Sequence, residues 1–171
     1  MRTLFTFFIV IGLSLPLTAQ AQYSAKSSDA RITIEAMQGL SVQTLRNLDF
    51  GTVVVNSGDV TVKPEDADAG EFLISGHKGK KVDITTSGNV DLIGQSTGES
   101  ITFMASFPTY DNDETPASST QFDTKTSTTA HLLGGHGNQG EVYVWFGGTI
   151  NTNGISSDTY VGDYNITVCY N

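Results

Sequence analysis

The sequence is poor in cysteine and in positive charge. Of its 171 residues one is a cysteine, Cys169, so no disulfide can form within the chain and the fold must rely on its core. Nine basic residues stand against 18 acidic ones, which gives a formal net charge of -9. A protein of this sign is poorly suited to nucleic acid or to an anionic membrane surface, so we expect neither as a partner.

Helical periodicity is also missing after the first 21 residues. Short segments instead alternate apolar and polar residues, and turns rich in Gly, Asn and Ser separate them about every eight to twelve residues. This pattern predicts an all-β sandwich or barrel without significant helix. Residues 22–171 have a suitable length for a single domain.

The N-terminus has the features of a secretory signal peptide, which we place at residues 1–21. Arg2 supplies the positive charge, residues 4–17 are almost continuously apolar, and Ala19-Gln20-Ala21 fits the cleavage rule. The apolar run is shorter than the roughly 20 residues of a membrane-spanning helix. We therefore expect export to the periplasm, the cell surface or the medium.

The clearest strand pattern lies in residues 160–171. Successive side chains of a strand point to opposite faces, so alternate residues share a face. The polar face would hold Cys169, and the chain would be fixed at its end by this strand. The predicted apolar face consists of Tyr160, Gly162, Tyr164, Ile166, Val168 and Tyr170.

Other segments give weaker signals. A hairpin is expected from residues 82–86 and 90–93, because a Ser-Gly-Asn turn separates two alternating runs. Residues 110–127 are predicted to form a long polar loop. Further strands are expected at residues 31–45, 48–55, 71–74, 101–107, 130–133 and 141–150, the last interrupted by Gly147-Gly148.

Three motifs occur in order: Leu48-Asp49-Phe50-Gly51-Thr52, Gly147-Gly148-Thr149, and Gly162-Asp163-Tyr164 leading to Val168 and Tyr170. Together they resemble a family of bacterial secreted domains of unknown function, over nearly all of residues 22–171. That family in turn resembles the chaperone–usher pilins. The resemblance implies an immunoglobulin-like antiparallel β-sandwich that lacks one strand.

The same resemblance implies how the protein works. Residues 22–38 would be an exchangeable N-terminal strand, with Ile32, Ile34 and Ala36 as its inserted side chains. The expected function is a structural subunit of an adhesive surface fibre or pilus, assembled by strand exchange with a periplasmic chaperone and an outer-membrane usher as partners. The C-terminal assembly strand would use Tyr164, Ile166, Val168 and Tyr170.

A monomeric binding module is the alternative function. It would use the 110–127 loop to bind a glycan or a protein. Tyr110, Phe122 and Trp145 could form an aromatic platform for a sugar, but we favour packing in the core or at the edge of the sandwich.

Catalytic and metal signals are weak. His131 and His136 lie five residues apart, but zinc requires three or four ligands in a fixed geometry, and no Gly-x-Ser-x-Gly elbow is present. The oxygen-rich loops DADAGE at 66–71 and YDNDET at 110–115 lack EF-hand spacing, and weak calcium binding there stays open. We expect no enzyme activity, no cofactor and no metal site.

Overall fold

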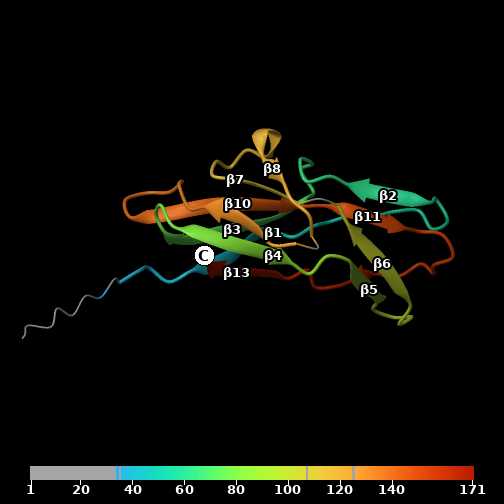
Figure 1. The fold of residues 1–171 in the computed structure, drawn as a ribbon. Coiled ribbons are helices and arrows are strands. Elements are labelled where there is room, and N and C mark those ends of the chain that lie inside the picture. The colour runs from blue at the N-terminus through green and yellow to red at the C-terminus, as the bar shows by residue number, and fades with distance from the viewer. Residues whose placement is uncertain (1–33, 35, 107, 125) are drawn as a thin grey trace, which may run out of the picture. The chain divides into compact units, whose positions relative to one another are not determined.

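The computed structural model describes residue 34 and residues 36–106, 108–124 and 126–171. Residues 36–171 form one compact unit, separate from residues 1–35. Within the described ranges the secondary structure consists of antiparallel strands and one 3-10 helix, without any α-helix (Figure 1). None of these described elements is a helix with the length and hydropathy to cross a bilayer. The all-β prediction is thus confirmed.

The elements are β1 (Ser41–Arg46), β2 (Asp59–Val62), β3 (Gly70–His77), β4 (Lys81–Thr86), β5 (Val90–Gly94), β6 (Ser100–Ala105), β7 (Thr109–Asp111), η1 (Pro116–Ser118), β8 (Thr120–Gln121), β9 (Thr128–His131), β10 (Gln139–Phe146), β11 (Gly148–Asn151), β12 (Tyr160–Val161) and β13 (Ile166–Tyr170).

The strands form three sheets. The first has the order β1-β3-β10-β7-β8, the second β12-β5-β6-β11-β2, and the third β13-β4-β9. In Figure 1, β3 and β10 of the first sheet and β4 and β13 of the third lie together at one end of the domain, whereas the second sheet occupies the other end. Neighbours in sequence are therefore often in different sheets.

The main core fills the space between the first and third sheets. On β3 and β10, Phe72 pairs with Val144 and Ile74 with Val142, so their apolar residues share a face. Complete burial of such side chains contributes about 1.5–3 kcal/mol each. The buried members are Phe72, Ile74, Val82, Ile84, Phe122, Ala130, Leu132, Val142, Val144 and Phe146.

A smaller core lies under the second sheet. Its buried residues are Ile101 and Phe103 on β6 and Ile150 on β11. Leu48 and Tyr164 pack against both cores. The two cores are thus joined by side chains that come from connecting segments rather than from strands.

The chain changes sheets at Gly147. β10 ends at Phe146 in the first sheet, and β11 begins at Gly148 in the second. The break falls at Gly147-Gly148, where the sequence predicts an interruption of the strand. A Cβ atom at Gly147 would collide with the carbonyl oxygen of Val62. Glycine is required here because another backbone passes directly over this position.

The hairpin expected between residues 82–86 and 90–93 is wrong. β4 pairs with β13 and β9, whereas β5 pairs with β6 and β12. The Ser87 N–H donates to the Asn165 carbonyl, and the Asn89 side chain accepts from the Ala105 N–H. The intervening turn therefore bonds to two other segments, and each strand faces a different core.

The strand expected at residues 48–55 is also wrong. Gly51 has a positive φ of 64°, and its N–H donates to the Asp49 carboxylate, so the chain turns where an extended ladder was expected. Leu48 and Phe50 instead pack into the cores from a loop.

Two further boundaries differ from the sequence prediction. The first described strand begins at Ser41, and residue 34 and residues 36–40 are not in a strand, whereas residues 31–33 and 35 of the expected strand lie outside the described residues. The 110–127 loop contains most of β7, η1 and β8 and is therefore less irregular than its polar composition indicates.

We expect Gly147→Ala to lower the free energy of unfolding by about 1–3 kcal/mol, the usual cost of overpacking, because the Val62 carbonyl cannot withdraw from its strand. Gly39→Ala is the matched control, since a Cβ there meets nothing within 4 Å. Urea denaturation of both variants measures the difference. Equal midpoints would show that the β10–β11 switch tolerates a side chain.

Candidate functional site

An open groove on the domain is lined by both apolar and polar residues. It lies between the loop that follows β1 and the segment that carries β12, and its volume is about 860 Å³. Loop backbone and core side chains together form its surface. The apolar lining includes Leu48, Phe50, Phe72, Leu92, Phe103, Phe146, Ile155 and Tyr164.

Aromatic rings form the floor of the groove. Phe146 stacks on Phe72 at 5.1 Å on one side and on Tyr164 at 4.4 Å on the other. Phe103 meets Tyr164 edge to face at 6.0 Å, and Phe50 meets Phe103 at 6.1 Å. Each such pair adds about 0.5–1.5 kcal/mol beyond area burial. The floor is consequently rigid, apolar and continuous with both cores.

Two carboxylates fasten one wall of the groove to the β5–β6 turn. Asp158 Oδ2 accepts hydrogen bonds from the backbone N–H groups of Ser96 and Thr97, both at 2.8 Å. Glu99 accepts from the backbone N–H of Ser156 at 2.8 Å. The pKa of each carboxyl lies below its ordinary value, mainly because it accepts a backbone hydrogen bond. The donor is the Thr97 N–H for Asp158 and the Ser156 N–H for Glu99.

Strand β13 leaves one edge free. It pairs with β4 on one side, and among the described residues no strand pairs with its other edge. The single strand expected over residues 160–171 is wrong, since β12 ends at Val161 in the second sheet and β13 begins at Ile166 in the third. Within β13 the alternation follows the prediction: Ile166, Val168 and Tyr170 are partly buried and pack on the main core, whereas Cys169 is exposed. Tyr164, just before β13, lines the groove. The four predicted C-terminal residues therefore lie along one partly covered apolar surface.

Strand β1 is also an edge strand. It pairs with β3, and within the described ranges nothing pairs with its other side. All six residues are exposed, including Val42 at 42% and Leu45 at 39%. Free edges bearing apolar side chains invite pairing with another chain unless something covers them.

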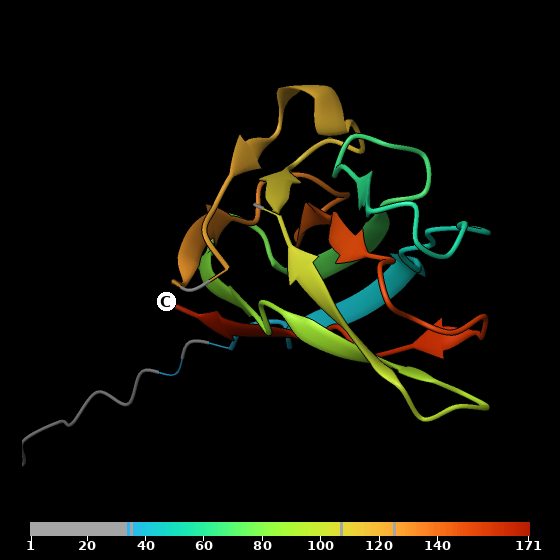
Figure 2. The same cartoon turned by 90° about the vertical axis from the view of Figure 1, so that its right-hand side faces the viewer.

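The Tyr170 hydroxyl ties the two edge strands together. It accepts a hydrogen bond from the His77 N–H at 2.7 Å and donates one to the Gln38 carbonyl at 2.6 Å. Figure 2 shows the end of β13 beside the chain that leads into β1. The penultimate aromatic residue is thus an anchor for three segments.

The predicted donor segment is described only in part. Ile32 lies outside the described residues. Ile34 is 87% exposed and Ala36 is exposed, and neither belongs to a strand. The single described isoleucine of this segment thus has its apolar side chain in solvent.

The other candidate residues do not gather into a catalytic or metal centre. Among the described residues no three His, Cys, Asp or Glu side chains are close enough to hold a metal. The two oxygen-rich loops nevertheless come together, since Asp66, Glu71 and Glu114 line one small pocket.

The aromatic platform is not exposed. Trp145 and Phe122 are both buried, and Phe122 contacts Tyr110 at 6.0 Å within the main core. Packing in the main core therefore accounts for Phe122 and Tyr110, whereas Trp145 is buried outside both core clusters.

Sequence reasoning missed the groove itself. Its lining comes from six stretches of chain, and alternation cannot tell which apolar residues border an open space. The Leu-Asp-Phe-Gly motif was the available signal, because Leu48, Asp49, Phe50 and Gly51 all line the groove.

Comparison with known proteins gives no match to any family model, curated protein or solved structure. The resemblance to secreted domains and pilins accordingly rests on the three sequence motifs.

We expect Tyr170→Phe to lower the free energy of unfolding by about 1–3 kcal/mol, since it leaves the part-buried His77 N–H without this acceptor and removes the hydrogen bond to the exposed Gln38 carbonyl. Tyr170→Ala should cost about 3–5 kcal/mol because the ring is lost as well. Chemical denaturation measures both. A phenylalanine variant as stable as the parent would refute the anchoring role of the hydroxyl.

The groove wall should loosen in acid. Folding lowers the pKa of Asp158 and Glu99, so their contribution is complete above the ordinary carboxyl pKa of about 4 and is lost as the pH falls through the lower folded-state values. Amide exchange followed by NMR should show protection at Ser96 and Ser156 falling before that of the core.

Asp158→Asn provides the control for this titration. It should reduce protection at Ser96 already at neutral pH and remove most of its acid dependence. Protection at Ser96 that is the same in the variant and the parent across the whole pH range would contradict the assignment.

Proposed function

We propose that the protein is a structural subunit of a secreted surface fibre, and that its groove receives a β-strand from a second copy. The observation that supports this most directly is the open groove of about 860 Å³, whose lining includes Tyr164 and Asn165, directly before the edge strand β13. An added strand would gain backbone hydrogen bonds from such an edge and place alternate side chains into the groove. The same strand would cover apolar surface that water otherwise contacts.

Residues 31–36 are the proposed occupant. Their sequence, RITIEA, alternates apolar and polar residues and therefore suits a strand with one buried face. The exposure of Ile34 supports this, because that side chain remains available to another molecule. Each isoleucine buried in the groove would contribute about 1.5–3 kcal/mol.

The proposed fold behind this function is an immunoglobulin-like sandwich that lacks one strand. Its support is the pair of sheets that face each other across the main core, together with the free edges of β1 and β13. Exchange would follow export directed by residues 1–21, to the periplasm or cell surface. A periplasmic chaperone would cover the groove beforehand, and an outer-membrane usher would serve assembly.

A monomeric binding module is the second candidate. The specific observation in its favour is that the loop between β7 and β8 supplies Glu114 and Pro116 to a pocket of about 440 Å³. In this case the protein would remain a monomer in solution and bind its ligand through that loop.

Strand exchange predicts that Ile32→Asp with Ile34→Asp abolishes multimers but leaves a folded subunit. The double change removes roughly 3–6 kcal/mol of apolar burial from the contact and introduces two charges that the bound strand would desolvate. Size-exclusion chromatography with light scattering, and gels run without heating, measure the multimers. A synthetic peptide covering residues 29–38 should bind the variant and raise its melting temperature.

Leu133→Asp is the matched control, because it places the same charge on an exposed leucine outside the groove. Its multimers should persist. A parent protein that stays monomeric at high concentration, with β13 amides fully protected, would refute strand exchange and favour the monomeric module.

A further inference from the structure

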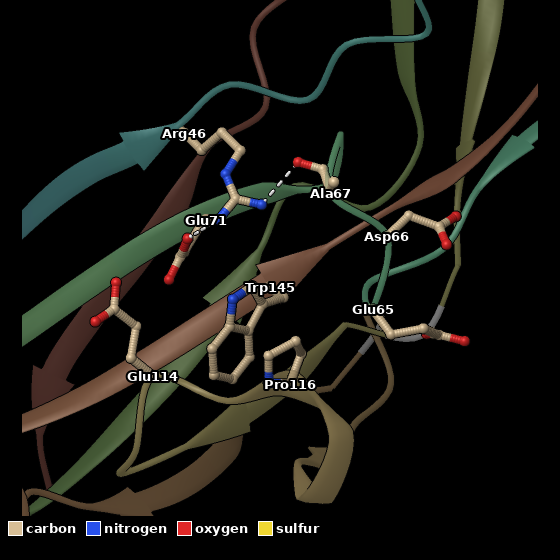
Figure 3. Close-up of a pocket in the computed structure, with 8 residues that line it drawn as sticks. All are labelled: Arg46, Glu65, Asp66, Ala67, Glu71, Glu114, Pro116 and Trp145. Atoms are coloured by element: carbon tan, nitrogen blue, oxygen red, sulfur yellow. Dashed lines mark hydrogen bonds and ion pairs between the residues drawn. The ribbon is translucent and has the colours of Figure 1, made fainter.

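A small acidic pocket lies on the face of the first sheet that points away from the main core. β1, β3 and β10 supply Arg46, Glu71 and Trp145, which are cross-strand neighbours. Two loops close the space, and one of them brings Glu114 and Pro116 over the sheet. Figure 3 shows these side chains gathered around one opening, with the carboxylates of Glu71 and Glu114 above and beside the Trp145 ring.

Glu71 is the unusual member. Its side chain is only 3% exposed, and its Oε2 lies 2.6 Å from Arg46 Nη2. Its Oε1 is buried and has no hydrogen-bond partner. A buried carboxylate oxygen without a donor is unfavourable, so this atom is a strong acceptor for any donor that enters the pocket.

Arg46 cannot satisfy both oxygens. Its Nη2 holds Glu71 Oε2, and its Nη1 donates to the Ala67 carbonyl at 2.8 Å. The guanidinium is therefore committed to fixing β1 against β3 and the 63–69 loop.

The charge of the lining favours a cation as the class of ligand. Glu65, Asp66, Glu71 and Glu114 line a volume of about 440 Å³ together with Arg46. Asp66 accepts from the Lys63 N–H and Glu65 lies 4.0 Å from the Lys63 ammonium, so Glu71 and Glu114 are the carboxylates that a ligand would meet. These carboxylates are not grouped as metal ligands, since no three acidic, His or Cys side chains within the described part of the chain converge closely enough. An organic cation requires fewer carboxylates than a metal ion does.

An alkylammonium group matches both halves of the pocket. It carries three N–H donors on a compact charge, and its methylene stem is apolar. The donors would reach Glu71 Oε1 and the Glu114 carboxylate. The stem would pack on Pro116 and on Trp145, which lines the pocket although it is only 2% exposed.

We propose that this pocket binds an alkylammonium group, either the side chain of a partner's lysine or a free primary amine. The inference is independent of strand exchange, because the residues that line the pocket and those that line the groove do not overlap.

Trp145 makes the test specific, since it is the one tryptophan in the sequence. Titration of the full chain with n-butylammonium chloride at constant ionic strength should give a saturable change in tryptophan fluorescence. Neutral n-butanol should give none, because it lacks the charge. Tetramethylammonium should give none, because it lacks N–H donors. Calcium chloride is the fourth titrant and should also leave the tryptophan fluorescence unchanged.

Two variants and one control define the site. Glu71→Gln and Glu114→Gln should each weaken n-butylammonium binding about tenfold or more, as expected for loss of a charge-assisted hydrogen bond. Glu114 lies on a loop, so its variant tests the site even where Glu71→Gln unfolds. Asp91→Asn removes the same charge from an exposed position on β5 outside the pocket, and binding should be unchanged.

N-acetyl-lysine-N-methylamide and 1,5-diaminopentane separate the two sources of the group. Tighter binding of the lysine derivative indicates a protein partner, and tighter binding of the diamine indicates a free amine; both outcomes support an alkylammonium site. The proposal is overturned by a linear, unsaturable response, by an equal response to calcium or tetramethylammonium, or by equal weakening in Asp91→Asn.

Discussion

The position of Phe146 between two aromatic rings is the contact on which the rest of this structure depends. Phe146 ends β10, stacks on Phe72 in the main core, and stacks on Tyr164 where the chain approaches β13. Tyr164 in turn touches Phe103 in the second core. One ring therefore links both cores, forms the centre of the groove floor and fixes the point after which the chain leaves the first sheet.

The free strand edges leave apolar surface uncovered in a chain that has no disulfide of its own to stabilise it. With one cysteine the chain cannot be reinforced by a disulfide of its own, so stability comes from apolar burial. Yet the groove and the edges of β1 and β13 leave apolar surface partly uncovered. Proteins normally protect such edges with charge, bulges or covering segments. These uncovered edges are the feature on which the proposed strand exchange rests.

Much of the fold could be predicted from alternation, and its failures have a common cause. The pattern at residues 160–171 gave the correct inward and outward faces of β13, and Gly147-Gly148 marked a true break. Sheet membership could not be read in this way, because β4 and β5 alternate equally well in one sheet or in two. The choice is made by Ser87 and Asn89, whose bonds to Asn165 and Ala105 join distant parts of the chain.

The candidate sites, too, divide into those set by a local sequence pattern and those set by long-range strand pairing. Tyr164, Ile166, Val168 and Tyr170 were predictable because they belong to one local pattern. The acidic pocket was not, although both of its oxygen-rich loops were noticed separately. Their meeting depends on the β1–β3–β10 register, which places Arg46 beside Glu71 and Glu71 beside Trp145. Register is a long-range property, and a single sequence contains little direct information about it.

That register also explains why one pair of strands can serve two unlike sites. Glu71 and Trp145 face the acidic pocket, whereas their neighbours Phe72 and Phe146 face the groove. A slip of one residue would exchange the faces and move a carboxylate into an aromatic core. Gly70 opposes such a shift, because its missing side chain leaves the space that the Phe146 ring occupies. The polar site and the apolar site are therefore specified together, by the same few pairings at one end of β3 and β10.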